Sequence, residues 1–233
     1  MFHDTPNAQP KMDKTDKTDK TDKMEQIVQA AAECFQAKGY QATTLRDIAE
    51  AVKLQKPTLY HYVRNKNELL FLVLINTAES YNRVLEAIVE SSLAPSAKLA
   101  QAVRQQILLQ FEHPGTVTLF RDLAYLDEPH RNEVRLVMKR YRDLLEVIIL
   151  EGIRVEEFQP CDTSLAVLLV LGAVNFVHRW YRPGGPKSLE AITEYYSQAL
   201  LGALRHTSTP VPPDVMGGKR AGRKLPAKTP VIK

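Results

Sequence analysis

Residues with hydroxyl, phenol and imidazole side chains lie close together in one short stretch of the chain, at Thr58, Tyr60, His61 and Tyr62. These groups can hydrogen-bond phosphate oxygens and the edges of bases. A helix that exposes so many of them is unusual unless a partner covers it. The chemistry that this stretch offers is therefore binding, and a nucleic acid is the candidate partner.

A first short helix is predicted just before this stretch. Thr44, followed three residues later by Asp47, is a capping-box pattern that predicts a helix start. Apolar residues then recur at the spacing of one helical face: Leu45, Ile48, Ala49 and Val52. The chain is predicted to break near Lys53.

The second helix is predicted to begin near Gln55, with Pro57 in its first turn, where the missing N–H costs little. Leu59 and Val63 are four residues apart and would pack inward, which leaves the hydroxyl, phenol and imidazole groups on the outside. Two short helices joined by a tight turn form a helix-turn-helix unit. The second helix of such a unit docks in the major groove of DNA.

The same residues resemble the DNA-binding signature of the tetracycline-repressor (TetR) family in two segments, 45–49 and 57–66. The resemblance implies a double-stranded DNA operator as the partner. Carried over to the matching positions, it implies DNA contacts at Thr44, Arg46, Lys56, Pro57, Thr58, Tyr60, His61, Tyr62 and Lys66. Among these, Lys56, Pro57 and His61 are expected to read bases. The phosphate contacts are expected at Thr44, Tyr60 and Lys66.

One residue departs from the family pattern, which usually has glycine where this chain has Lys53. If the turn needs a left-handed residue there, lysine costs on the order of 1 kcal/mol. The departure concerns the geometry of the turn and leaves the helix-turn-helix prediction in place.

The sequence contains no recognisable constellation of catalytic or metal-ligating residues. Its six histidines are scattered, and the His130–Glu133 pair has the spacing of an ordinary helix surface. It has no HExxH motif, phosphate-binding glycine loop or nucleophile elbow. We therefore expect no catalytic residues, no metal and no cofactor, and an enzyme has no positive support.

Two segments of the C-terminal half, 126–131 and 175–185, resemble the regulatory domain of one TetR branch. That branch controls fatty-acid and sterol breakdown and responds to acyl-coenzyme A thioesters. The resemblance implies a small-molecule effector of that class, with a planar cationic drug as the alternative. The candidate effector-binding residues are Arg121, Tyr125, Asn175 and Phe176.

The effector residues keep alternatives of their own. Asn175 lies in an apolar helix and needs a hydrogen-bond partner, which could be a ligand, core backbone or an interface. Arg121 could face an anion in a pocket, or it could be solvated or ion-paired.

Composition and cysteine usage indicate a soluble, cytoplasmic protein. The 233 residues are 44% hydrophobic and 25% charged, and Cys34 and Cys161 are too far apart to suggest a disulfide framework. No signal peptide is recognisable. The longest apolar run, 165–177, is too short to cross a bilayer and predicts a helix buried in a bundle, so no membrane partner is expected.

Helical periodicity without strand-like alternation predicts an all-α fold. We expect disordered tails at 1–23 and 207–233, a helix-turn-helix DNA-binding domain over 24–66, and an effector-binding and dimerisation domain over 67–206. The C-terminal tail has a net charge of +5, so the rest of the chain has −1.

These features predict a homodimeric, ligand-responsive transcriptional regulator, most simply a repressor. The last two bundle helices would pair with their mates about a two-fold axis. The two recognition helices would then lie about 34–36 Å apart and fit a palindromic operator. The rival class is a helical lipid or acyl carrier, or an enzyme that uses the bundle cavity, but the aromatic, basic surface at 56–66 has no role in a carrier.

Overall fold

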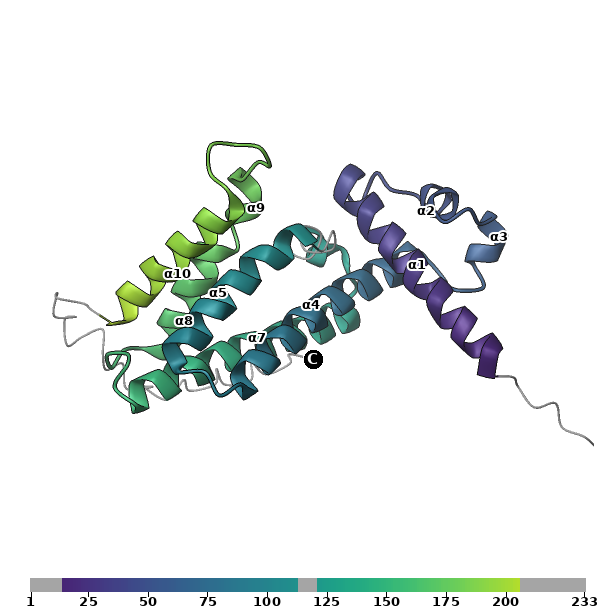
Figure 1. The fold of residues 1–233 in the computed structure, drawn as a ribbon. Coiled ribbons are helices and arrows are strands. Elements are labelled where there is room, and N and C mark those ends of the chain that lie inside the picture. The colour runs from purple at the N-terminus through teal and green to yellow at the C-terminus, as the bar shows by residue number, and fades with distance from the viewer. Residues whose placement is uncertain (1–13, 113–120, 206–233) are drawn as a thin grey trace, which may run out of the picture.

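The computed structural model describes residues 14–112 and 121–205, with side chains from residue 20 onward, and this part of the chain is helical without strands (Figure 1). The predicted all-α fold is confirmed. The expected C-terminal tail lies outside the described residues. The helices are α1 Lys14–Lys38, α2 Leu45–Ala51, α3 Lys56–Leu59, α4 Lys66–Glu90, α5 Pro95–Glu112, the 3-10 helix η1 Leu123–Tyr125, α7 Glu128–Arg154, α8 Thr163–Val174, α9 Val177–Trp180 and α10 Leu189–Arg205.

Helix α1 begins at Lys14, within the segment 1–23 that was expected to be disordered, so residues 14–23 are helical and the expected disorder there is wrong. The Lys-Thr-Asp repeat places an aspartate four residues before a lysine, a spacing that stabilises a helix. The continuous helix that follows supplies the nucleus that an isolated repeat lacks. At its other end, Gly39 has φ +83°, as expected for a glycine that closes a helix.

Helices α1, α2 and α3 form a small head at one end of the molecule, and α4 runs from this head into the body beside α7 (Figure 1). The head and the N-terminal half of α4 share one hydrophobic cluster, which includes Ile27, Phe35, Ile48, Leu59, Leu70 and Leu74. Leu126 and Val134 belong to the same cluster, although they come from the body. The head core is therefore completed by residues of the other domain.

A second hydrophobic cluster forms the core of the body, where α5 packs on α7 and α10. Its fully buried side chains include Leu85, Leu99, Ile107, Leu145 and Ile148. Lys98 is also buried there, and its ammonium lies 3.0 Å from the Glu151 carboxylate, which offsets the cost of burying the charge. Helix α4 contributes to both clusters and so connects them mechanically.

The buried helix predicted from the apolar run 165–177 is wrong in two respects. It is broken at Asn175 and Phe176 into α8 and α9, and Leu165, Leu168 and Leu169 are more than half exposed in the single chain. By length and composition alone, Thr163–Trp180 is apolar enough to cross a membrane, the one such stretch among the described residues, but the core helix of a soluble protein passes the same test. Periodicity could not show that this apolar helix has an uncovered face.

Candidate DNA-binding surface and effector cavity

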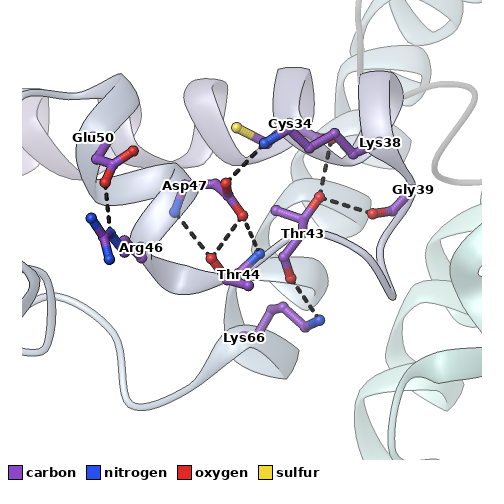
Figure 2. Close-up of polar contacts among 9 residues, drawn as sticks. All are labelled: Cys34, Lys38, Gly39, Thr43, Thr44, Arg46, Asp47, Glu50 and Lys66. Atoms are coloured by element: carbon purple, nitrogen blue, oxygen red, sulfur yellow. Dashed lines mark hydrogen bonds and ion pairs between the residues drawn. The ribbon is translucent and has the colours of Figure 1, made fainter.

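The first helix of the helix-turn-helix unit begins with the predicted capping box, which is confirmed (Figure 2). The Thr44 hydroxyl accepts from the Asp47 N–H at 3.2 Å, and the Asp47 carboxylate accepts from the Thr44 N–H at 2.7 Å. The same carboxylate pairs with the Lys38 ammonium at 2.8 Å. These hydrogen bonds hold the pKa of Asp47 well below its ordinary value, so the cap is charged at neutral pH.

The turn between the two helices has the left-handed residue that the sequence suggested. Lys53 has φ +54°, and the chain closes behind it through a 2.8 Å bond from Leu54 N–H to Ala49 C=O. Lysine is therefore strained where glycine would not be. The exposed Lys53 side chain adds a positive charge beside the second helix.

Helix α3 is anchored from below by Leu59 and Val63, which are 0% and 2% exposed. What we term the recognition surface is formed by side chains of α3 and of the residues that follow it, namely Lys56, Pro57, Thr58, Tyr60, His61 and Tyr62. Thr58 and Tyr62 are half-buried, and Tyr62 also packs against the head core. Residues 52–66 contain no acidic side chain. The Lys56 ammonium lies 6.0 Å from the centre of the Tyr60 ring, at the outer limit of a cation–π contact, so the two side chains lie next to each other on this surface.

Two other predicted contact residues flank this surface. Thr44 and Arg46 are both exposed, with the Arg46 guanidinium 2.8 Å from the Glu50 carboxylate. Such an exposed pair is weak and can be exchanged for a phosphate contact at small cost. Both residues therefore remain compatible with the predicted role.

Lys66 does not have the geometry expected of a phosphate contact. Its ammonium donates to the carbonyls of Tyr40, Gln41 and Thr43 at 2.9, 3.3 and 2.8 Å, and lies 4.4 Å from the centre of the Tyr40 ring (Figure 2 shows the Thr43 bond). An ammonium has three protons, and all three are used. Lys66 therefore orders the loop between α1 and α2, and Thr44 with it.

A cavity of about 340 Å³ lies in the body between α4, α5, α7 and α8. Asn175 and Phe176, two of the predicted effector residues, line it. Arg142 on α7 also lines it, is exposed, and has no ion pair with a described residue. The lining residues are Ala78, Tyr81, Gln106, Met138, Tyr141, Arg142, Leu168, Leu171, Gly172, Asn175 and Phe176, with no acidic side chain among them.

Polar side chains meet where α5 faces the break between α8 and α9. Gln106 donates to the Asn175 side-chain oxygen at 2.9 Å, and Gln110 donates to the Val174 carbonyl at 2.9 Å. The Gln110 oxygen faces the backbone N–H and Nδ1 of His178 at 3.3 and 3.2 Å. Burial lowers the pKa of His178, so its imidazole is neutral at pH 7. Gln110 thus satisfies backbone groups that the helix break exposes.

Tyr141 adds a phenol to the cavity wall, and its ring meets the Tyr81 ring edge-on with centroids 6.1 Å apart. Burial raises the pKa of Tyr141, so the phenol stays protonated over the physiological range. The cavity is therefore an apolar space with a few neutral polar groups and one cation at its edge.

Arg121 and Tyr125, the other predicted effector residues, do not line this cavity. The Arg121 guanidinium holds Asp122 at 2.9 and 2.8 Å and donates to the Phe35 carbonyl at 2.6 Å. The Tyr125 ring stacks on Tyr40 with centroids 5.3 Å apart. Both side chains reach from the body to the head because η1 lies against the end of α1. We term these contacts the head–body contact.

Sequence reasoning missed Arg142, Gln106 and Tyr141 as cavity residues. Arg142 follows Met138 by four residues, so the helix spacing alone could have placed both on one face of α7. Gln106 and Gln110 show a similar spacing on α5, where glutamines among apolar residues are a signal for a polar patch in the core.

Comparison with known proteins agrees with this geometry. The family model "Bacterial regulatory proteins, tetR family" matches residues 27–73, and the model "Tetracyclin repressor-like, C-terminal domain" matches residues 92–204. The transcriptional repressor KstR2 of Mycolicibacterium smegmatis is 27% identical over 182 residues, covering 77% of this chain and 89% of its own. The regulator HbdR of an Aromatoleum species is 27% identical over 156 residues, covering 66% and 67%.

Solved structures have the same fold. The TetR-family regulator PfmR of Thermus thermophilus is 28% identical with a TM-score of 0.70, covering 75% of this chain and 96% of its own. AibR, solved with isovaleryl coenzyme A and operator DNA, is 24% identical with a TM-score of 0.69, covering 78% and 97%. A helix-turn-helix head, a cavity-bearing helical body and two matching family models lead to one conclusion: the chain belongs to the tetracycline-repressor (TetR) family of bacterial transcription regulators.

Proposed function

We propose that this protein is a repressor that binds a palindromic operator as a homodimer and is released when an acyl-coenzyme A thioester enters the cavity. The observation that carries the proposal is one chain that combines an exposed recognition surface with an apolar cavity. Helix α4 is common to both, because it shares a hydrophobic cluster with Leu59 and Val63 beneath the recognition surface and also lines the cavity. A helical carrier or enzyme would use the cavity alone and would leave the recognition surface without a role.

DNA binding is proposed through the recognition surface, with the bases read by Lys56, Pro57 and His61. Its exposure, positive charge and rigid anchoring by Leu59 and Val63 support this role. His61→Ala is expected to relax sequence preference at one position of each half-site. Lys56→Ala is expected to weaken binding to the operator more than to random DNA, and to relax sequence preference at the position that it reads. A duplex selected from a random pool supplies the operator for both titrations.

The homodimer is proposed to form through α8 and α10. Leu165, Leu168 and Leu169 are exposed on α8, and Tyr195 is 72% exposed on α10. Large apolar side chains that are exposed in the single chain are typical of an interface. Leu165→Glu, which is outside the cavity lining, is expected to yield a monomer by light scattering and to lose operator binding, because a single head holds only one half-site. A variant that remains dimeric would place the interface elsewhere.

The acyl-coenzyme A class is supported by charge and size. The lining holds one cation and no acidic residue, which suits an anionic ligand and disfavours a cationic drug. A cavity of about 340 Å³ is at the small end of ligand sites, so it accommodates an acyl group while the nucleotide stays at the edge near Arg142. AibR, which has this fold, was solved with an acyl-coenzyme A and operator DNA.

Release is proposed to pass through α4 and the head–body contact, because both join the cavity-bearing domain to the head. The effector must bind the non-DNA state better than the DNA-bound state. Moving the population from mostly competent to mostly incompetent takes a differential of roughly 5 kcal/mol. The proposed site of action is the cytoplasm, where operator and thioester meet.

The test is mass spectrometry of small molecules retained by the purified protein, followed by operator-release titrations with a panel of acyl-coenzyme A thioesters. Thioesters are expected to release the operator and raise the melting temperature. Free fatty acids are expected to be poor substitutes, since they lack the phosphates. Arg142→Ala is the matched variant, expected to weaken thioester binding, and Arg135→Ala on the same helix is the control. If no thioester acts, the effector class is wrong.

A further inference from the structure

Gln106 and Asn175 meet at the cavity in an arrangement that leaves hydrogen-bonding groups unused. One bond of 2.9 Å joins the Gln106 Nε2 to the Asn175 Oδ1. The Gln106 Oε1 then has no donor among the described residues, although the side chain is only 5% exposed. Asn175 is half-buried and lines the cavity, and its bond to Gln106 uses its oxygen, which leaves its Nδ2 available as a donor. The pair therefore has a free acceptor and a free donor at the cavity wall.

Such an unsatisfied oxygen is uncommon in this structure. Three buried side-chain oxygens of the described residues lack a donor, on Asn67, Asn82 and Gln106, and only Gln106 lines the cavity. Gln110, one turn further along α5, is fully engaged by Val174 and His178. Buried polar groups are normally paired, so the exception at the cavity indicates a partner that comes from the ligand.

We propose that the enclosed part of the effector carries a hydroxyl group that pairs with Gln106 and Asn175; this inference rests on the effector role proposed for the cavity. A hydroxyl donates to one group and accepts from the other, whereas a plain hydrocarbon chain satisfies neither and a keto oxygen only accepts. Exchanging oxygen and nitrogen in both amides swaps the two free groups, and a hydroxyl still matches them. The effector class is thus a hydroxylated acyl thioester.

A site built to pair with a hydroxyl discriminates strongly against the analogue that lacks it, because its buried polar groups stay unpaired. The expected preference is on the order of 10-fold or more in Kd. The size of the cavity restricts the chain to a short one, so the hydroxyl lies within a few carbons of the thioester or at the end of a short chain.

The experiment compares hexanoyl-coenzyme A with its 2-hydroxy, 3-hydroxy and terminal-hydroxy forms by calorimetry and by operator release. At least one hydroxylated form is expected to bind on the order of 10-fold more tightly than hexanoyl-coenzyme A. Gln106→Met, which keeps the chain length without the amide, is expected to bring all forms to similar affinity. Gln105→Met is the control, because Gln105 lies on the same helix and lines a different groove.

The outcomes separate the inference from the function beneath it. If no thioester binds, the proposed effector class falls and the hydroxyl falls with it. If thioesters bind but no hydroxylated form is preferred, the repressor function stands and the hydroxyl inference is overturned. A preference that survives in Gln106→Met also overturns it. The comparison on the unmodified protein decides the matter even if the variant folds poorly.

Discussion

Removing the Arg121 guanidinium is expected to separate effector binding from operator release. Arg121 is the residue that joins η1 to the last turn of α1, through its 2.6 Å bond to the Phe35 carbonyl. Arg121→Met keeps a flexible chain of similar length and removes every donor. The contact between the head and the body would then be weaker. The residues of the recognition surface and of the cavity are unchanged in this variant.

The magnitude follows from what the guanidinium contacts. A charge-assisted hydrogen bond contributes about 1.5–3 kcal/mol, and Asp122, which is 2% exposed, also loses its cation. The Arg121 side chain is 42% exposed, so solvent screens part of this. We expect a loss of about 1–3 kcal/mol. Allosteric coupling energies have the same range, about 5- to 150-fold, so the loss can remove most of the coupling.

The assay is fluorescence anisotropy of a labelled operator duplex, titrated with and without saturating effector. The unmodified protein is expected to lose operator affinity strongly when effector is present. For Arg121→Met we expect the effector to bind, with the effector-induced change in operator affinity reduced by about 10-fold.

Arg140→Met is the control for the loss of an arginine. The Arg140 guanidinium pairs with the Glu86 carboxylate at 2.9 Å, between α7 and α4 within the body. Because the Arg140 side chain is mostly exposed, losing this pair is expected to lower the free energy of unfolding by about 0–1 kcal/mol. If Arg121→Met responds to effector as fully as Arg140→Met does, the head–body contact takes no part in release and the reasoning is refuted.

Three further predictions concern stability. Lys53→Gly is expected to raise the free energy of unfolding by up to about 1 kcal/mol, because glycine adopts the φ of +54° without strain; a loss in urea denaturation would contradict this. Asp47→Asn is expected to lower stability at neutral pH, since the folded-state pKa of Asp47 is depressed by its bonds to Lys38 and the cap. That deficit is present above about pH 4 and disappears as the pH falls through the folded-state pKa, so denaturation curves that differ equally at pH 7 and near pH 2 would rule it out. Gly152→Ala is expected to lower stability by about 1–3 kcal/mol, because its Cβ would overlap the Phe158 ring; Phe158→Leu in the same chain should recover part of the loss in a thermal melt.

Local signals predicted the helix-turn-helix unit well because its determinants lie close together in the sequence. The Thr44–Asp47 cap and the left-handed Lys53 each depend on neighbours within a few residues. The contacts of Arg121 and Lys66 could not be predicted because their partners are remote. Arg121 bonds to a carbonyl 86 residues away, and Lys66 to carbonyls 23–26 residues away. No spacing rule identifies such partners.

The cavity was only half predictable for a related reason. Asn175 was conspicuous as a polar residue in an apolar run, and it lines the cavity. Arg142 was indistinguishable from the other basic residues of α7, because only the packing of α4, α5 and α8 around it creates a cavity wall. The exposed side of α8 was hidden in the same way, since an apolar residue reads alike whether the same chain or a second copy covers it.

The break between α8 and α9 places the only tryptophan of the chain, Trp180, one turn beyond Phe176 of the cavity wall. Its side chain is half exposed, so its emission is sensitive to what approaches this part of the body. The head contains tyrosines but no tryptophan. Excitation at the red edge of the protein absorption band, where tryptophan absorbs and tyrosine does not, therefore gives emission from Trp180 in the body alone. Ligand entry can be followed by intrinsic fluorescence, without a label, while DNA is titrated against the other domain.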